Sequence, residues 1–384
     1  MHFFHQVCII LAIGVSQAGA ETSSRLVVTF KTTNDNVLDG VDLNDLGGIK
    51  VVKQYGRRLV VDLGREAVLE SDAEWLGQEL QDVEGVELDL MISATQIDYI
   101  FSDLLTVDND TFASPAGGDS LDSAPDSAPF QWNLLDSEPY SIHAESLWPL
   151  TNSTPDVVVA ILDTGLPDFR LAGMDITLLR HHEPGYDFIS DASISMDSDG
   201  RDASAYDPGD AGPDCPEASW HGLRVASVLA ADHQGPLRGV AQNCTLLPVR
   251  VLGMCRAGYA SDVADAIVWA AGGAINGLPP NTRRAHVISM SFTGRGGCPN
   301  NLQSAVTQAI RLGSLLIAAA GNQNSDSAAF FPANCEGVVA VGASTRQGAL
   351  ADYSNYGATI LAPGGDAAAP IAMLTMQEGG LVPD

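Results

Sequence analysis

Five apolar runs recur along the second half of the chain, and each has the length of one β-strand. They are 157–162, 246–252, 287–291, 315–320 and 338–341. Continuous runs rich in Val, Ile, Leu and Ala are typical of strands that are buried on both faces. Helical patterns lie between them, at 221–231, 261–272 and 300–312. The alternation predicts right-handed crossovers, and therefore one parallel sheet with helices on both faces in an α/β domain from residue 130 onward.

The N-terminal part of the chain has a different pattern. Strand-like runs occur at 26–30, 49–52, 58–63 and 85–90, with a helical stretch at 73–80. Strands and one helix in so short a segment predict a small α+β module over 21–105. Residues 106–129 are rich in Asp, Pro, Ser and Gly, which is typical of an exposed linker open to proteolytic processing.

The first 20 residues have the pattern of an export signal. An apolar run at 7–15 is followed by Ala18-Gly-Ala20, a small-residue cleavage pattern directly before Glu21. The segment is atypical because no Lys or Arg precedes the run, and a short buried helix is the alternative. No later apolar stretch approaches the ~20 residues that span a bilayer. We expect a secreted or periplasmic protein with no membrane association after cleavage.

The run Val157-Val-Val-Ala-Ile-Leu ends at Asp163-Thr-Gly165, which puts a carboxylate at the carboxyl edge of the predicted sheet. His221 begins an alternating small and aliphatic stretch, so its imidazole is expected at a helix N-terminus. An acid followed by a histidine is consistent with a general base, His221, oriented by Asp163. Either residue alone is more often structural. A third segment changes this, because the strand at 315–320 ends in Gly321-Asn322, and an Asn amide is a suitable oxyanion donor.

These blocks together resemble those of the subtilisin-like serine proteases (subtilases), in particular the secreted bacterial extracellular proteases. The acid–histidine–serine order of that family matches Asp163 and His221. Further similarity lies in 247–253, 287–291, 338–343 and Tyr353-Ser-Asn-Tyr-Gly357, and the resemblance covers about 130–365.

The resemblance implies a subtilisin-like peptidase domain over 130–384, with an inhibitory propeptide at 21–105 as the chain's own partner. It implies protein or peptide substrates, a monomer, and a cleft bordered by residues at the ends of two strands. These are Ser291, Phe292, Thr293, Gly294, Ala319, Ala320 and Gly321. It also implies two disulfides, Cys215–Cys255 and Cys298–Cys335, which leaves Cys244 either as a free buried thiol or as a partner for a residue beyond 384.

The chain departs from the family at the histidine helix and at the nucleophile. Leu223 and Ser227 stand where the family usually has Thr and Gly, adding atoms where the helix packs closely. The family's Gly-Thr-Ser motif has no match. One interpretation aligns Gly364-Gly-Asp366 with it, which gives a non-catalytic peptide-binding pseudoprotease. The other takes Leu361-Ala-Pro-Gly-Gly365 as the turn that precedes the nucleophile by many residues, which gives a serine endopeptidase whose sequence stops before its serine. We favour the second.

Charge and composition limit the classes of binding partner and metal that the chain is expected to have. The net charge of −29 argues against nucleic acid, because no basic patch exists to neutralise phosphates. The sequence contains no C-x-x-C pair, so a zinc site is not expected. In an exported chain, cysteines are expected to form disulfides. No cofactor is expected for catalysis. Closely spaced carboxylates offer a possible structural calcium site, since Ca²⁺ prefers oxygen ligands; a solvated acidic loop is the alternative. The candidate ligands are Asp187, Asp191, Asp197, Asp199 and Asp202, in an acidic segment that continues to Asp207 and Asp210.

Overall fold

The computed structural model describes twelve stretches of the chain. They are residues 25–30, 50–55, 58–62, 83–88, 91–93, 131–150, 155–168, 179, 181–232, 237–241, 243–377 and 380–383. The expected export signal, the helix expected at 73–80 and the linker at 106–129 lie outside these residues. Everything below concerns the described part of the chain.

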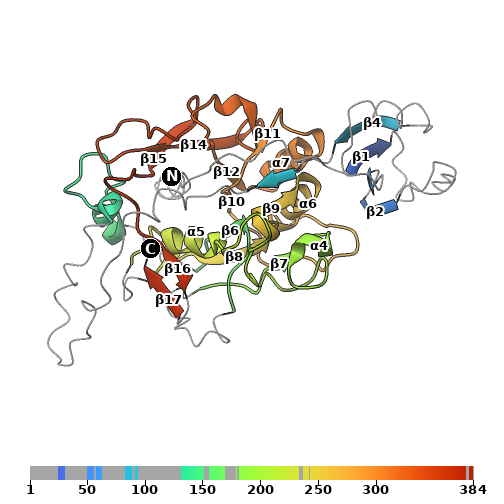
Figure 1. Ribbon diagram of the computed structural model, residues 1–384, viewed down its shortest axis with the longest axis horizontal. Helices are drawn as coiled ribbons and strands as arrows, with labels where there is room; N and C mark the ends of the chain where they lie inside the picture. Colours follow the sequence, from blue (N-terminus) through green and yellow to red (C-terminus); the bar gives the residue numbers. More distant parts are fainter. Residues whose placement is uncertain are drawn as a thin grey trace.

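A seven-stranded sheet forms the centre of the molecule, in the order β15-β14-β12-β10-β6-β8-β7 (Figure 1). All its neighbouring strands pair in parallel, as the sequence predicts. The strands are β6 (Val158–Asp163), β7 (Tyr186–Asp187), β8 (Thr245–Arg250), β10 (Val287–Met290), β12 (Leu315–Ala319), β14 (Val338–Ser344) and β15 (Ile360–Pro363). The five predicted strands are all present, and the edge strands β7 and β15 were not predicted.

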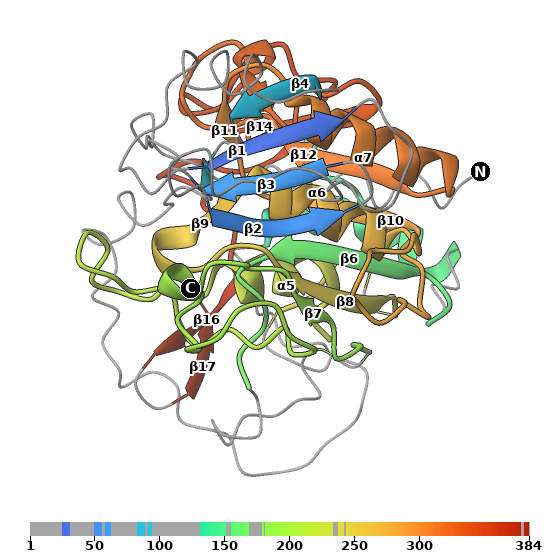
Figure 2. The same cartoon turned by 90° about the vertical axis from the view of Figure 1, so that its right-hand side faces the viewer.

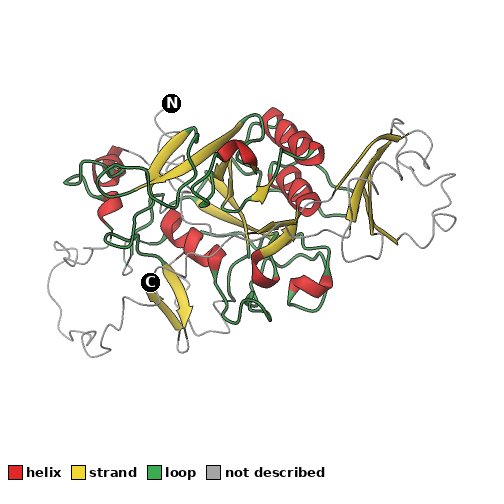
Figure 3. Ribbon diagram, turned by 45° about the horizontal axis from the view of Figure 1, so that its top comes forward, coloured by secondary structure: helices red, strands yellow, loops and turns green. Residues whose placement is uncertain are grey.

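Helices cover both faces of this sheet (Figure 3). The long helices are α5 (His221–Ala230), α6 (Ala260–Ala270) and α7 (Asn300–Arg311), and the short ones are α3 (Ala144–Leu147) and α4 (Ala192–Ser195). Side chains of β6 alternate between two cores: Val159 and Ile161 pack with α5, whereas Ala160 and Leu162 pack with α6 and α7. Because every position of the strand is buried, the strand appears in the sequence as an unbroken apolar run.

A four-stranded antiparallel sheet, β2-β3-β1-β4, lies beside α6 and α7 (Figures 1 and 2). Its strands are β1 (Arg25–Phe30), β2 (Lys50–Tyr55), β3 (Arg58–Asp62) and β4 (Val83–Leu88). These match the predicted N-terminal strands closely. Leu26 and Val28 of β1 are fully buried, so this sheet has an apolar face of its own.

Three short antiparallel pairs complete the structure, and none was predicted. They are β5 (Met91–Ser93) with β9 (Ala257–Tyr259), β11 (Gly294–Arg295) with β13 (Phe330–Phe331), and β16 (Leu374–Gln377) with β17 (Gly380–Pro383). The first pair joins the N-terminal part of the chain to the α/β domain. The third is a hairpin that packs against α5.

Candidate active site

The sheet brings three of the predicted segments to one edge. Strands β6, β10 and β12 are parallel neighbours, and they end at Asp163, Met290 and Ala319. Asp163, the segment 291–294 and Asn322 therefore all lie at the carboxyl edge of the sheet, where open α/β folds bind their ligands.

Asp163 and His221 form a buried pair. Nδ1 of His221 lies 2.8 Å from Oδ1 and 2.9 Å from Oδ2 of Asp163, and the two residues are 0% and 3% exposed. The backbone N–H of Thr164 donates a second hydrogen bond, of 2.7 Å, to Oδ1 of Asp163. A carboxylate at Nδ1 fixes the proton there and leaves Nε2 free to accept one.

Nε2 of His221 is buried, and it has no hydrogen-bond partner in the described part of the chain. His221 is the first residue of α5, as predicted, and its backbone N–H is 3.3 Å from the hydroxyl of Ser219. The next residue must be small. A Cβ on Gly222 would lie 2.2 Å from the carbonyl oxygen of Gly165, so glycine allows the helix to approach the end of β6.

A buried polar network supports this pair, and sequence reasoning missed its role. Thr164 donates a 2.6 Å hydrogen bond to Asp207 and accepts one of 3.0 Å from the Gly222 backbone. Asp210 accepts hydrogen bonds from the backbone and hydroxyl of Ser219, at 2.5 and 2.7 Å. Both acids belong to the acidic segment that begins at Asp187, and only their burial distinguishes them from solvated carboxylates.

The loop that carries Asn322 is held by Asn355, which is fully buried. Its amide nitrogen donates to the carbonyl of Ala320, and its amide oxygen accepts from the backbone N–H groups of Gln323 and Ser325. Gly321 has φ +106°, and a Cβ there would lie 2.4 Å from the Asn355 amide nitrogen. The sequence signal for Asn355 is the Tyr353–Gly357 block, which carries part of the family resemblance.

The residues predicted to border the cleft are all buried in the structure. The side chain of Phe292 is fully buried in the core with α6 and α7, so only its backbone can border a cleft. Ser291 and Thr293 are 2% and 5% exposed, and Gly294 pairs with Phe331 of β13. Ala319, Ala320 and Gly321 are also buried.

The two departures in the histidine helix are accommodated. Leu223 is fully buried in the core that α5 shares with the sheet. Ser227 donates through Oγ to the carbonyl of Arg224, at 2.7 Å, and accepts a 2.9 Å hydrogen bond from the backbone N–H of Leu374. The additional hydroxyl of Ser227 therefore connects α5 to the β16–β17 hairpin.

Asp366 lies in a turn after β15. Its Oδ1 accepts the backbone N–H groups of Ala368 and Ala369, each at 2.9 Å. Within the described residues no hydrogen bond or ion pair joins it to His221, whose Nε2 has no partner. The preceding Ile360–Pro363 segment is the edge strand β15, paired with β14.

Four of the five candidate calcium ligands lie near one another: Asp199 lies beside Asp197 and Asp202, and the backbone of Asp187 pairs with that of Asp202. Asp187 and Asp197 both contact Arg250, which is 1% exposed. Asp191 caps α4, and Asp202 accepts the backbone N–H of Ser204. In the described part of the chain no group of three or more His, Cys, Asp or Glu side chains is placed to hold a metal ion. Calcium binding stays a prediction, which melting with and without a chelator checks.

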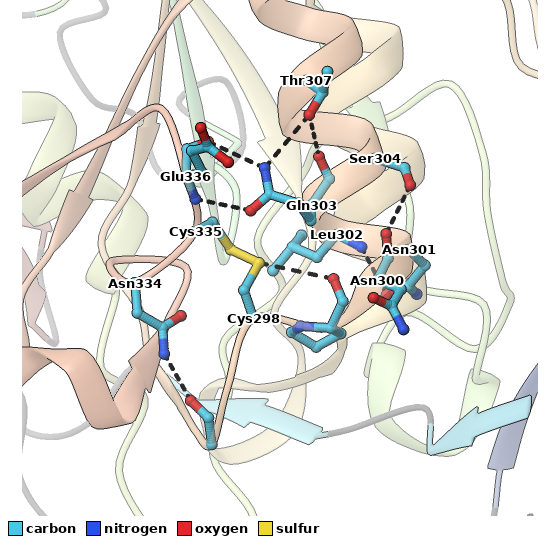
Figure 4. The surroundings of a disulfide bond; sticks show 12 residues. Cys298, Asn300, Asn301, Leu302, Gln303, Ser304, Thr307, Asn334, Cys335 and Glu336 are labelled. Carbon is cyan, nitrogen blue, oxygen red and sulfur yellow. Dashed lines mark hydrogen bonds between the residues drawn. A yellow bond between two sulfur atoms is a disulfide. The ribbon is translucent and has the colours of Figure 1, made fainter. Parts of the chain in front are cut away.

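Both implied disulfides are present, Cys215–Cys255 and Cys298–Cys335, and Cys244 is free and buried. The first joins the segment before His221 to the segment before β9. The second joins the start of α7 to the loop after β13, where Gln303 and the backbone of Glu336 exchange hydrogen bonds of 3.1 and 2.8 Å (Figure 4).

Comparisons with known proteins agree with this geometry. The chain is 43% identical over 213 residues to an extracellular protease of Xanthomonas campestris, which covers 53% of this chain and 36% of that protein. It is 39% identical over 250 residues to an extracellular basic protease of Dichelobacter nodosus, which covers 61% and 40%. The chain thus spans about two fifths of the length of these relatives.

Solved structures show the same fold. A protease from Pseudoalteromonas arctica matches with a TM-score of 0.60 and 37% identity, over 68% of this chain and 80% of that one. Fervidolysin from Fervidobacterium pennivorans matches with a TM-score of 0.63 over 97% of this chain and 51% of that one, at 18% identity, which supports the fold alone. The described part of the chain contains no helix long and apolar enough to cross a membrane. The family model of the subtilases matches residues 154–380, and the chain belongs to the subtilase family.

Proposed function

We propose that this chain carries the acid, the base and the oxyanion donor of a secreted serine endopeptidase. The observation that carries the proposal is the buried Asp163–His221 pair, with Nε2 of His221 lacking a partner. In this mechanism Nε2 accepts the proton of a serine hydroxyl as that oxygen attacks the peptide carbonyl. Asp163 holds the imidazole in the required tautomer and stabilises the imidazolium that forms.

Asn322 is assigned to the oxyanion. Its amide would donate to the carbonyl oxygen as negative charge develops there, and Asn355 would keep the loop in place. Removal of such a donor costs about 10²–10³ in kcat, a figure measured on subtilisin itself. The serine is not assigned, since the family's Gly-Thr-Ser motif has no match among these 384 residues.

We further propose that residues 21–105 act as an intramolecular inhibitor. Strand β5 pairs antiparallel with β9, in the register Met91↔Tyr259, Ile92↔Gly258 and Ser93↔Ala257. It also packs against β11, which continues the 291–294 segment. A peptide substrate held as an added strand would use the same backbone groups of β9, so β5 would compete with it. Processing between residues 106 and 129 would then release the enzyme, which we expect to act as a monomer.

The alternative is a peptide-binding protein without catalysis, with Asp366 in the place of the nucleophile. The position of Asp366 favours the peptidase, because its carboxylate accepts the backbone N–H groups of Ala368 and Ala369 within its own turn. Export is supported by the relatives named extracellular proteases and by the leader pattern in residues 1–20.

The test measures peptide hydrolysis by the product of the complete gene. His221→Ala should lower kcat by about 10⁶-fold, the loss found for the base of a serine protease triad. His143→Ala is the matched control, because this exposed histidine should leave kcat unchanged. A complete gene product without peptidase activity would favour the binding protein. Residues 1–384 alone should not react with a fluorophosphonate, and labelling that is lost on mutation of one serine would contradict the assignment.

A further inference from the structure

Arg25 is an unusual residue in the N-terminal sheet. It is the first residue of β1, yet it is only 4% exposed, and arginine is rarely buried without a partner. Its side chain reaches out of its own sheet to the segment before α4 and to the end of β9.

Three groups of the α/β domain contact the guanidinium group of Arg25. Nη1 donates to Oγ of Ser190 at 3.0 Å, and Nη2 contacts Oδ2 of Asp191 at 3.2 Å. The guanidinium carbon lies 3.9 Å from the ring centroid of Tyr259. A hydroxyl and a carboxylate for the N–H groups, together with an aromatic ring for the flat face, match a planar cation with several donors. An ammonium group has no flat face to stack in this way.

The α/β domain holds these groups in place by itself. Oδ1 of Asp191 accepts the backbone N–H and the hydroxyl of Ser193 at the start of α4, at 3.0 and 2.7 Å, which leaves Oδ2 for the cation. The backbone N–H and hydroxyl of Ser190 both donate to Asp262, each at 3.0 Å. The hydroxyl of Tyr259 is 3.4 Å from Oδ2 of Asp191. The site therefore does not need Arg25 for its arrangement.

These groups also lie at the end of β9, the strand with which β5 pairs. Leu26, next to Arg25, pairs with Leu88 of β4, and Met91 of β5 pairs with Tyr259. Only residues 89 and 90 separate these two paired positions along the chain. A polypeptide that paired with β9 in the place of β5 would have one residue opposite Tyr259. The residues before that one would thus reach the groups that contact Arg25.

We propose that Ser190, Asp191 and Tyr259 form a guanidinium-binding site whose ligand is an arginine side chain. Arg25 fills the site in this chain and anchors the N-terminal sheet to the α/β domain. Loss of Arg25 from the site opens it to another guanidinium group. This binding is separate from the proposed peptidase chemistry, and it can be measured without any hydrolysis.

The test is chemical rescue of Arg25→Ala in the full chain. The variant should melt roughly 2–6 °C below the native protein, because a buried cation contact is lost. Millimolar ethylguanidinium should raise this melting temperature again with a saturable dose dependence, since a ligand that binds only the folded state stabilises it. The native chain should show no saturable increase, because Arg25 already fills the site.

Two isosteres and two variants make the result specific. Ethylurea, which is neutral, should not rescue, and ethylammonium should bind at least ~10-fold more weakly. Adding Asp191→Asn to Arg25→Ala should abolish rescue. Arg346→Ala is the matched control, because Arg346 pairs with Glu138 at an exposed position and leaves no enclosed site. Equal rescue by ethylurea, equal stabilisation of the native chain, or rescue that persists with Asp191→Asn would overturn the proposal.

A second measurement applies if Arg25→Ala does not fold. Asp191→Asn in the otherwise native chain should increase amide hydrogen exchange at Leu26 and Val28 several-fold, because the anchor of β1 is weakened. Arg346→Ala, whose guanidinium pairs with Glu138 at an exposed position, should not. Unchanged exchange in Asp191→Asn would also overturn the proposal.

Discussion

The hydroxyl of Thr164 joins the carboxylate of Asp207, at 2.6 Å, to the backbone N–H of Gly222, at 3.0 Å. Thr164 directly follows Asp163, and Gly222 directly follows His221. One hydroxyl thus links the strand of the acid to the helix of the base. Asp207 is fully buried and orients this hydroxyl, so its protonation state affects the geometry of the pair.

We expect Asp207 to make the folded state less stable as the pH rises. Burial raises the pKa of Asp207 to about 7, and the nearby charge of Asp210 adds to this effect. A carboxyl whose pKa is higher in the folded than in the unfolded state stabilises the fold fully below the unfolded value near 4. That contribution is lost as the pH rises through about 7. The loss is on the order of a few kcal/mol.

The measurement is the free energy of unfolding in urea between pH 4 and pH 8. Asp207→Asn should flatten the decline, whatever its effect on absolute stability. Part of the slope should remain, because burial also raises the pKa of Asp187 to about 7 despite the neighbouring Arg250. Asp202→Asn is the control, and it should leave the slope unchanged. A slope that is identical in Asp207→Asn and the native chain would contradict the expectation.

The central sheet could be predicted from the sequence because its strands are buried on both faces. Val158–Asp163 is apolar at every position before the acid, so its pattern needs no partner to be recognised. The β5–β9 pair could not be predicted, since three residues with no periodic signal pair with residues far along the chain, from Met91↔Tyr259 to Ser93↔Ala257. Their pairing depends on how two parts of the chain pack.

The candidate active site, too, could be predicted from the sequence only in part. Asp163 ends β6 and His221 begins α5, and Asn322 follows three residues after β12, so motif and element type agree at all three. Asp207 and Asn355 lie in loops, and their roles depend on burial and on hydrogen bonds to distant backbone groups. Nothing in the local sequence distinguishes Asp207 from an exposed carboxylate, and the Tyr353–Gly357 block marks Asn355 without indicating its role.

Ser227→Ala should loosen the β16–β17 hairpin. The substitution removes the oxygen that accepts the Leu374 backbone N–H at 2.9 Å, and Leu374 is only 2% exposed. A buried donor left without a partner costs about 1–3 kcal/mol. Amide exchange at Leu374 should therefore rise at least several-fold. The control is Ser304→Ala, an exposed position whose hydroxyl donates to the carbonyl of Asn300 in its own helix. Unchanged protection of Leu374 would show that the hairpin is held by other contacts.

Asn355→Ala should release the loop that carries Asn322. The amide makes hydrogen bonds to Ala320, Gln323 and Ser325 from a fully buried position, so the substitution leaves several backbone groups unpaired. We expect a loss of about 3 kcal/mol in the free energy of unfolding, with faster amide exchange at 323 and 325. In the complete gene product, kcat should fall more than KM rises, because the oxyanion donor is displaced.

The control for this loop is Asn334→Ala. Its amide donates to the carbonyls of Gly296 and Ala328, so it holds a different part of the surface. Exchange at 323 and 325 should stay as in the native chain. If both variants loosen these amides equally, the loop is held by general packing and not by Asn355.

Thiol counting tests the cysteine assignment. Cys244 is 1% exposed, and burial raises the pKa of its thiol to about 12, so it should not react with a thiol reagent in the native protein at pH 8. In denaturant without reductant, a chain that begins at Glu21 should show one reactive thiol. A chain that retains Cys8 should show two. Cys244→Ala should remove one thiol from either chain. Three or more reactive thiols from Glu21 onward would mean that Cys215–Cys255 or Cys298–Cys335 does not form, and no thiol would mean that Cys244 has found a partner.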